Sequence, residues 1–378
     1  MFMNILFIGS SLDVSNGGVD RVTYILSCFF QKNGLRCYYV FLPKAIDKVE
    51  GGKGLSIPYN MDSKFWKNDL ERFVKVNKIE IIINQAQWSP FLIGEFDTLK
   101  KTYNCKIISC FHVSPDANDY FRTFKGTLLN SVYKFLHGYD RSAYYCREAV
   151  KYSDVFVLLS KSFIPSFIKR FKVEKYKEKL IAIPNPLSFQ DNYSYEFCKK
   201  KKQVLIVSRL EEKQKNINSA LRIWKIIEQN VTDWNLVIAG HGPSESINRD
   251  YANQLRLRRV NFIGRVQDPR ELYKESSIFM MTSRFEGFGM VLTESQQFGC
   301  VPFAFDNFSV VHDIVDNERN GIIIPSNDEM LYANKMLSLI CSPSDLSVLA
   351  ENAVNDCKKF SVDNVGQQWL SLLNSVSL

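Results

Sequence analysis

The segment 283–294 carries two glutamates and two glycines at a spacing suited to a phosphorylated ligand. It reads Ser283-Arg284-Phe285-Glu286-Gly287-Phe288-Gly289-Met290-Val291-Leu292-Thr293-Glu294 and follows a predicted strand that ends at Met281. A strand, a glycine-containing turn and a helix in that order leave backbone N–H groups exposed at the helix start, where they bind phosphate. Gly287 and Gly289 allow close backbone approach. Glu294 lies about two turns beyond Glu286, so it can reach toward the cleft from the start of the same helix.

Two cationic side chains follow another predicted strand, Gln203–Val207. Arg209 and Lys215 lie in the sequence Ser208-Arg209-Leu210-Glu211-Glu212-Lys213-Gln214-Lys215-Asn216. When a C–O bond to a diphosphate breaks, fixed cations and helix-end N–H groups stabilise the developing negative charge most strongly in the transition state. The cations of this loop, Arg209 together with Lys213 or Lys215, are therefore suited to stabilise such a charge.

Three further segments stand in order around these residues. They are Ala239-Gly240-His241-Gly242-Pro243, Phe262-Ile263-Gly264-Arg265-Val266 and Phe298-Gly299-Cys300-Val301-Pro302. The ordered set, which spans Ser208–Pro302, resembles the C-terminal domain of retaining glycosyltransferase family 4, an enzyme family with the GT-B fold and a Glu-x7-Glu motif. In the first half the likeness is thinner and consists of Asn16-Gly17-Gly18-Val19, His112 and Pro184-Asn185-Pro186.

The resemblance implies a role for each matching residue. Glu286 would hold sugar hydroxyls near the reacting centre, Glu294 would bind ribose hydroxyls, and His112 would contact the donor sugar or the reacting region. The family retains configuration through a same-face attack, so neither glutamate is expected to be a covalent nucleophile. The implied catalytic residues are Glu286, Arg209, Lys215 and His112, and the implied donor-binding residues are Gly17, Gly18, Gly240, Arg265, Val266, Gly287, Phe288, Gly289, Met290 and Glu294.

Structural explanations stay open for several of these residues. Gly17-Gly18 also fits an ordinary turn between a strand and a helix, and His112 also fits a buried structural histidine. Arg265 and Val266 are as compatible with a structural role as with contact to the nucleotide base. His241 stands where the family usually has aspartate, which removes the basis for a charge-based role there.

A metal ion is not expected at the site, and no cofactor is predicted. The chain contains no Asp-x-Asp sequence. Metal-dependent GT-A transferases use carboxylates to hold a divalent ion on the diphosphate. Arginine, lysine and a helix terminus can supply the same stabilisation without a metal.

Short apolar runs alternate with helical patterns along the whole chain, which favours parallel sheets built from βαβ units. The predicted strands are Ile5–Ile8, Cys37–Leu42, Ile79–Asn84, Lys106–Phe111, Val155–Leu159, Leu180–Ile183, Gln203–Val207, Trp234–Ala239, Val260–Ile263, Ile278–Met281, Val301–Phe305 and Gly321–Ile324. We expect an α/β protein with two Rossmann-like, doubly wound domains that face each other across a cleft. The predicted boundaries are 1–187 for an acceptor-side domain, 188–361 for a nucleotide-sugar-binding domain, and 362–378 for a terminal helix that crosses back to the first.

The charge is uneven along the chain. The net charge is +8, whereas residues 1–190 carry 27 Lys plus Arg and 17 Asp plus Glu, so the positive charge belongs to the first half. A basic face fits either ordinary solvation or contact with an anionic acceptor or the anionic inner membrane surface. The segment Tyr120–Tyr145, rich in aromatic and basic residues, fits an amphipathic helix on lipid or a helix packed on its own sheet. No nucleic-acid-binding motif accompanies the charge, so nucleic acid is not an expected partner.

The apolar run at the start of the given sequence is shorter than a membrane span needs. Nine cysteines without a Cys-x-x-Cys pair favour reduced thiols. We therefore expect a cytoplasmic protein, peripheral at most at the inner membrane face. The expected partners are a nucleotide-sugar donor, with UDP favoured over GDP, and a saccharide or lipid-linked acceptor. Two alternatives stay open: another GT-B enzyme, such as a nucleotide-sugar epimerase or a phosphorylase, and a non-catalytic nucleotide-sugar-binding subunit.

Overall fold

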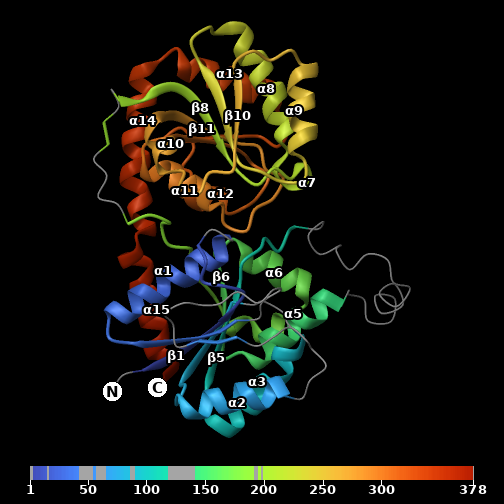
Figure 1. Ribbon diagram of the computed structural model, residues 1–378, viewed down its shortest axis with the longest axis vertical. Helices are drawn as coiled ribbons and strands as arrows, with labels where there is room; N and C mark the ends of the chain where they lie inside the picture. The colour runs from blue at the N-terminus through green and yellow to red at the C-terminus, as the bar shows by residue number, and fades with distance from the viewer. Residues whose placement is uncertain are drawn as a thin grey trace. The chain divides into compact units, whose positions relative to one another are not determined.

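The computed structural model describes residues 3–14, 17–41, 54–56, 65–85, 90–117, 141–190, 195–196 and 199–377. The chain forms two compact units (Figure 1). Unit 1 contains Met1–Pro186 and Val362–Leu378, and unit 2 contains Leu187–Ser361. The predicted boundary between residues 187 and 188 lies one residue from this division.

Unit 1 is built around a parallel sheet with the strand order β3-β2-β1-β4-β5-β6-β7 in its described part. Its elements are β1 (Asn4–Gly9), α1 (Gly18–Lys32), β2 (Arg36–Phe41), β3 (Gly54–Ser56), α2 (Phe65–Val76), β4 (Ile81–Asn84), α3 (Pro90–Tyr103), β5 (Lys106–Phe111), α5 (Arg141–Tyr152), β6 (Val155–Leu158), α6 (Phe163–Phe171), η2 (Glu174–Lys179), β7 (Leu180–Ala182) and α15 (Val362–Ser377).

The C-terminal helix α15 packs on α1 inside unit 1, and Figure 1 shows the two side by side, in red and blue. The rings of Trp369 and Phe30 meet edge to face, with centroids 6.5 Å apart. Gly366 brings the two helices close, because a Cβ at that position would lie 2.4 Å from the Phe29 ring. Aromatic packing and one small residue thus fix the last helix to the first.

Unit 2 contains a second parallel sheet, ordered β10-β9-β8-β11-β12-β13. Its elements are β8 (Lys201–Val207), α7 (Glu212–Lys215), α8 (Ile217–Asn230), β9 (Asn235–Ala239), α9 (Glu245–Gln254), β10 (Val260–Gly264), α10 (Arg270–Glu275), β11 (Ser276–Met281), α11 (Met290–Gln297), β12 (Val301–Phe305), α12 (Val311–Ile314), β13 (Ile322–Ile324), α13 (Glu329–Ile340), α14 (Pro343–Asp356) and η4 (Cys357–Phe360). The fully buried Trp224 and Tyr332 anchor its apolar core.

Each predicted strand is present, and the predicted architecture of two Rossmann-like, doubly wound domains is confirmed. The strands were recognisable because parallel strands covered by helices on both faces are almost continuously apolar. The three-residue strand β3, Gly54-Leu55-Ser56, was not predicted, because it is too short and too polar to show such a pattern. Among the described helices, none combines the length and apolar character that a membrane crossing requires.

Candidate active site in unit 2

The order of strands in unit 2 reverses between β8 and β11, which pair in parallel at the centre of the sheet. At such a point the loops that leave the two strands diverge, and ligands of doubly wound sheets bind at the carboxyl ends of the strands beside them. The loop after β8 carries Arg209 and Lys215, and the loop after β11 carries Glu286. The two loops that the sequence singled out therefore leave neighbouring strands at the same edge.

Lys215 and Glu286 form a direct ion pair. The Lys215 Nζ atom lies 2.6 Å from Glu286 Oε1, and the two side chains are only 16% and 8% exposed. A pair this far from water is held more strongly than a surface pair, and removal of one partner leaves the other charge uncompensated. The site therefore contains a cation that is fixed in place by a carboxylate.

A narrow pocket joins the elements around this pair. Its lining includes Ser208 after β8, Lys215 at the end of α7, Ser283 after β11 and Val291 in the first turn of α11. The Ser208 hydroxyl is buried, and within the described residues it has no hydrogen-bond partner. A cation, the first turn of α11 and an unsatisfied hydroxyl thus border one small space.

Arg209 is the second residue after β8 and is exposed, whereas its neighbour Leu210 is buried and anchors the loop. The Leu210 N–H donates to the His241 carbonyl at 2.9 Å. Gly240 has a φ of +152°, and a Cβ there would lie 1.8 Å from the Ser208 carbonyl oxygen. The glycine therefore has a steric role beneath the loop that carries Arg209, and direct donor contact by Gly240 stays a prediction.

Helix α11 begins at Met290, so the segment has the order of strand, glycine-containing turn and helix that the sequence predicted. Gly289, which precedes the helix, has a φ of +82°, and this left-handed conformation separates the turn from the helix. Glu286 lies in the turn with Gly287 and the buried Phe288, whereas Glu294 lies inside α11. The Glu286 carboxylate is therefore held by a turn and the Glu294 carboxylate by a helix.

Glu294 is buried and already engaged within unit 2. Its Oε1 atom accepts a hydrogen bond from Ser188 Oγ at 2.5 Å, and its Oε2 atom accepts one from Tyr273 OH at 2.9 Å. These donors fix the orientation of the carboxylate. A carboxylate has about four acceptor positions in total, so the two bonds are compatible with further donors such as ribose hydroxyls.

The remaining predicted donor residues of unit 2 follow β10. Gly264, the last residue of that strand, has a φ of +74°, and after it Arg265 is exposed and Val266 half-buried. Their predicted contact with the nucleotide base stays a prediction.

In unit 1, predicted residues also stand at carboxyl ends of strands. Gly17 precedes α1 and Gly18 is its first residue, and both are exposed; Asn16 lies outside the described residues. His112 follows β5 and contacts Gln85, which follows β4: the His112 Nε2 atom and the Gln85 Oε1 atom form a hydrogen bond. Gln85 was not predicted, although its position one residue beyond a strand next to β1 is a signal that could have found it.

The His112 ring is neutral at physiological pH, because burial lowers its pKa to about 4. With the Gln85 carbonyl oxygen as acceptor, Nε2 carries the hydrogen and Nδ1 carries the lone pair. Neither Nδ1 nor the Gln85 Nε2 atom has a partner in the part of the chain that the structure describes. His112 and Gln85 therefore offer one acceptor and one donor, groups that a hydroxyl ligand could bind.

This histidine should make unit 1 sensitive to acid. Because the folded-state pKa lies below the ordinary value of 6.5, the unfolded chain binds more protons, and stability falls as pH drops from about 6.5 to 4. The loss from this group approaches ~3 kcal/mol at pH 4. In urea titrations across this range, His112→Gln should lose less stability than wild type, whereas the exposed control His241→Gln should follow wild type. Parallel losses in wild type and His112→Gln would contradict this account.

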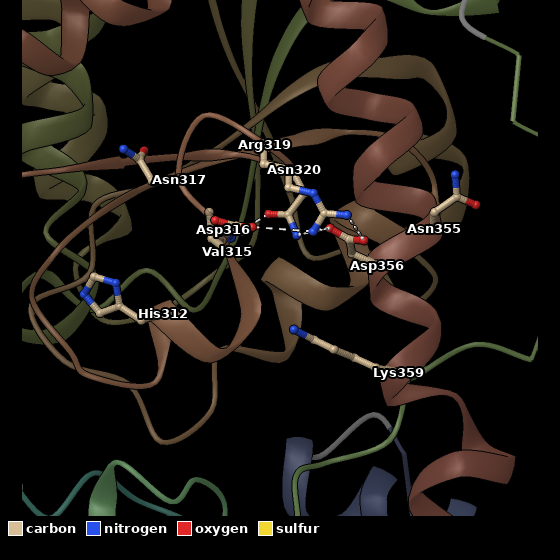
Figure 2. Close-up of a pocket in the computed structure, with 9 residues that line it drawn as sticks. All are labelled: His312, Val315, Asp316, Asn317, Arg319, Asn320, Asn355, Asp356 and Lys359. Carbon is tan, nitrogen blue, oxygen red and sulfur yellow. Dashed lines mark hydrogen bonds and ion pairs between the residues drawn. The ribbon is translucent and has the colours of Figure 1, made fainter.

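Another cavity of unit 2, of about 680 Å³, contains none of the predicted site residues. Four of its polar residues, Asp316, Arg319, Asn320 and Asp356, contact each other (Figure 2). Arg319 lies 3.0 Å from Asp356, and Asn320 donates to the same carboxylate at 2.9 Å. These contacts tie the loop after α12 to the end of α14, which is a structural role.

The predicted amphipathic segment Tyr120–Tyr145 lies mostly outside the described residues, which resume at residue 141. Contact of this segment with a membrane stays a prediction.

Comparison with known proteins agrees with the geometry. Residues 190–356, nearly all of unit 2, match the family described as glycosyl transferases group 1. An α-1,4-N-acetyl-D-galactosaminyltransferase of Campylobacter jejuni is 25% identical over 205 residues, which are 54% of this chain and 56% of the relative. The chain spans about half the length of the curated relatives that it matches.

Solved structures resemble the whole chain. The lipopolysaccharide outer core galactosyltransferase WaaB has a TM-score of 0.74 at 17% identity over 99% of both chains. Anabaena HepE in complex with UDP has a TM-score of 0.75 at 17% identity over 99% of this chain and 100% of that one. The fold is therefore that of the GT-B glycosyltransferases. The family match and the curated relative support the predicted glycosyltransferase superfamily for this chain.

Proposed function

We propose that this chain is a retaining glycosyltransferase of family 4 that transfers a sugar from a nucleoside-diphosphate sugar, without a metal cofactor. The observation that carries the proposal is the buried Lys215–Glu286 pair, at 2.6 Å, where the strand order of unit 2 reverses. A cation held in that position, beside the first turn of α11, suits a ligand with a diphosphate group.

The chemistry follows from charge. As the bond between the anomeric carbon and the diphosphate oxygen breaks, negative charge grows on the diphosphate. Lys215, Arg209 and the first N–H groups of α11 stabilise this charge, so they lower the barrier rather than only binding the donor. The acceptor oxygen bonds to the anomeric carbon on the same face, and its proton passes to the departing diphosphate.

The carboxylates supply orientation. Glu286, once Lys215 turns toward the phosphates, accepts hydrogen bonds from sugar hydroxyls near the reacting carbon. Glu294, already fixed by Ser188 and Tyr273, accepts hydrogen bonds from the ribose. Neither residue acts as a covalent nucleophile in this mechanism.

UDP is the favoured nucleotide, and the product belongs to cell-surface polysaccharide or glycolipid biosynthesis. The structural neighbour HepE was solved with UDP, and WaaB is named for the lipopolysaccharide outer core. The Campylobacter relative is named for a glycan acceptor on diphosphoundecaprenol. These names support a saccharide or lipid-linked acceptor for the present chain.

Ligand-induced stabilisation tests the donor class. A ligand that binds only the folded state raises stability by ~3 kcal/mol at one hundred times its Kd. UDP and UDP-sugars should therefore raise the melting temperature of unit 2, and uridine, which lacks the phosphates, should not. No shift with UDP, GDP or any of their sugars would remove the proposal.

Product analysis separates the alternatives. A transferase consumes the UDP-sugar that binds best only when an acceptor is present, whereas an epimerase converts it without an acceptor. A phosphorylase requires free phosphate to cleave a glycosidic bond. Tight donor binding without any of these reactions would assign a non-catalytic subunit instead.

A further inference from the structure

Two segments of unit 2 that lie far apart in the sequence are joined by several hydrogen bonds. They are residues 212–216, which include α7, and residues 282–286, which end at the catalytic candidate Glu286. The backbone N–H of Arg284 donates to the Gln214 carbonyl at 2.8 Å. The Thr282 hydroxyl contacts the carbonyls of Lys215 and Asn216 at 3.1 and 3.0 Å. Both the backbone and the side chains of the second segment thus hold the first.

The guanidinium of Arg284 completes this connection. Its Nη1 atom donates to the Glu212 carbonyl at 2.6 Å and lies 3.3 Å from the Lys213 carbonyl. Its Nη2 atom donates to Asn216 Oδ1 at 2.6 Å. The side chain therefore binds backbone carbonyls of α7 and the residue that ends this helix.

Helix α7 requires such support. It has four residues, Glu212–Lys215, and is followed by Asn216, whose φ of 52° is left-handed. A single helical turn has little stability of its own, and its last carbonyls have no partner inside the helix. The Arg284 guanidinium adds donors to the carbonyls of the first two residues of this turn, and its charge complements the negative end of the helix dipole. Lys215 is the last residue of α7, so its position depends on how this turn is held.

We propose that Arg284 is a positioning residue: it fixes α7 against the β11–α11 turn and thereby aims Lys215 at the diphosphate. This inference rests on the proposed function, and it assigns to Arg284 an effect that acts through Lys215 and not through contact with the donor. Arginine suits the role better than lysine, because its planar fork reaches two acceptors at fixed positions whereas an ammonium is a single point of charge.

A double-mutant cycle tests whether the effect passes through Lys215. The dissociation constant of UDP is measured by titration calorimetry for wild type, Arg284→Gln, Lys215→Ala and the double variant. Arg284→Gln alone should weaken UDP binding about tenfold, which is within the coupling range of contacting networks. In the Lys215→Ala background the same change should alter the dissociation constant of UDP less than about twofold, because the ammonium group that Arg284 positions is absent.

Two further variants separate positioning from general loss of stability. Arg284→Lys should recover only part of the affinity, since it restores the charge without the fork. Arg319→Gln removes an arginine that ties another loop of unit 2 to Asp356, at 3.0 and 3.1 Å, and should leave UDP affinity unchanged (Figure 2).

The outcomes are distinguishable. Equal losses from Arg284→Gln in both backgrounds, or an equal loss from Arg319→Gln, would overturn the positioning role while leaving the proposed function intact. If wild type binds neither UDP nor GDP, the proposed function fails, and this inference fails with it.

Discussion

Lys215→Ala should lower the rate of sugar transfer by about 100- to 1,000-fold, the usual effect of removing one group that stabilises charge in a transition state. Lys215 is the cation that the structure holds at the point where the strand order reverses, paired with Glu286 at 2.6 Å. The two proteins are compared by their initial rates of UDP-sugar consumption in the presence of an acceptor that wild type uses. UDP affinity should fall as well, because the cation also contacts the diphosphate in the ground state.

Lys213→Ala is the matched control for this experiment. Lys213 lies on the same helix but is exposed, and it contacts Arg284 only through its backbone carbonyl. It should retain transfer close to wild type. A severe loss in Lys213→Ala together with normal turnover in Lys215→Ala would move the assignment to Lys213.

The stability of unit 2 should also change in Lys215→Ala, because the variant leaves Glu286 buried without its counter-charge. Breaking a buried pair from one side costs about 3–5 kcal/mol, less where the orphaned carboxylate takes up a proton. Adding Glu286→Gln to this variant should recover much of the stability and none of the transfer. This pattern would show that the loss of activity does not arise from unfolding.

Glu286→Gln should lower the rate of sugar transfer about as much as Lys215→Ala does. The variant should nevertheless bind UDP more tightly than wild type does. In the unliganded protein the Glu286 carboxylate pairs with Lys215, so a diphosphate has to displace it to reach this cation. The negative charge of Glu286 also repels the phosphates. Glutamine keeps the shape and removes the charge, so binding improves although the sugar is no longer oriented. Titration calorimetry with UDP and a transfer assay on the same preparation measure the two effects.

A second carboxylate of unit 2 supplies the control. Glu329 pairs with Arg222 at 2.6 Å and, like Glu286, accepts from a cationic side chain. Glu329→Gln should change neither UDP affinity nor transfer. If UDP affinity instead fell in Glu286→Gln in parallel with transfer, Glu286 would be a binding residue for the nucleotide and not for the sugar.

The sequence predicted the fold well because each buried parallel strand is a short apolar run between helical patterns. Residue type, order and the family resemblance singled out Arg209, Lys215 and Glu286, and the topology makes the strands before them neighbours. Two features were beyond this reasoning. The direct contact of Lys215 with Glu286 depends on α7 being folded against the β11–α11 turn, which contacts made by Arg284 bring about.

The exact start of α11 was the second feature. The sequence predicted a glycine-containing turn before this helix, and the left-handed conformation of Gly289 shows that the helix begins at Met290. In unit 1 the hydrogen bond between His112 and Gln85 was also missed. The two residues follow strands that are adjacent in the sheet, and no sequence motif marks the pair.

The crystal structure of the protein with UDP would test the central claim most directly. We expect a phosphate oxygen within hydrogen-bond distance of Lys215 Nζ and of the first N–H groups of α11, with the ribose hydroxyls on Glu294. UDP bound at any other place, or Lys215 still paired with Glu286 and out of reach of the phosphates, would contradict the account.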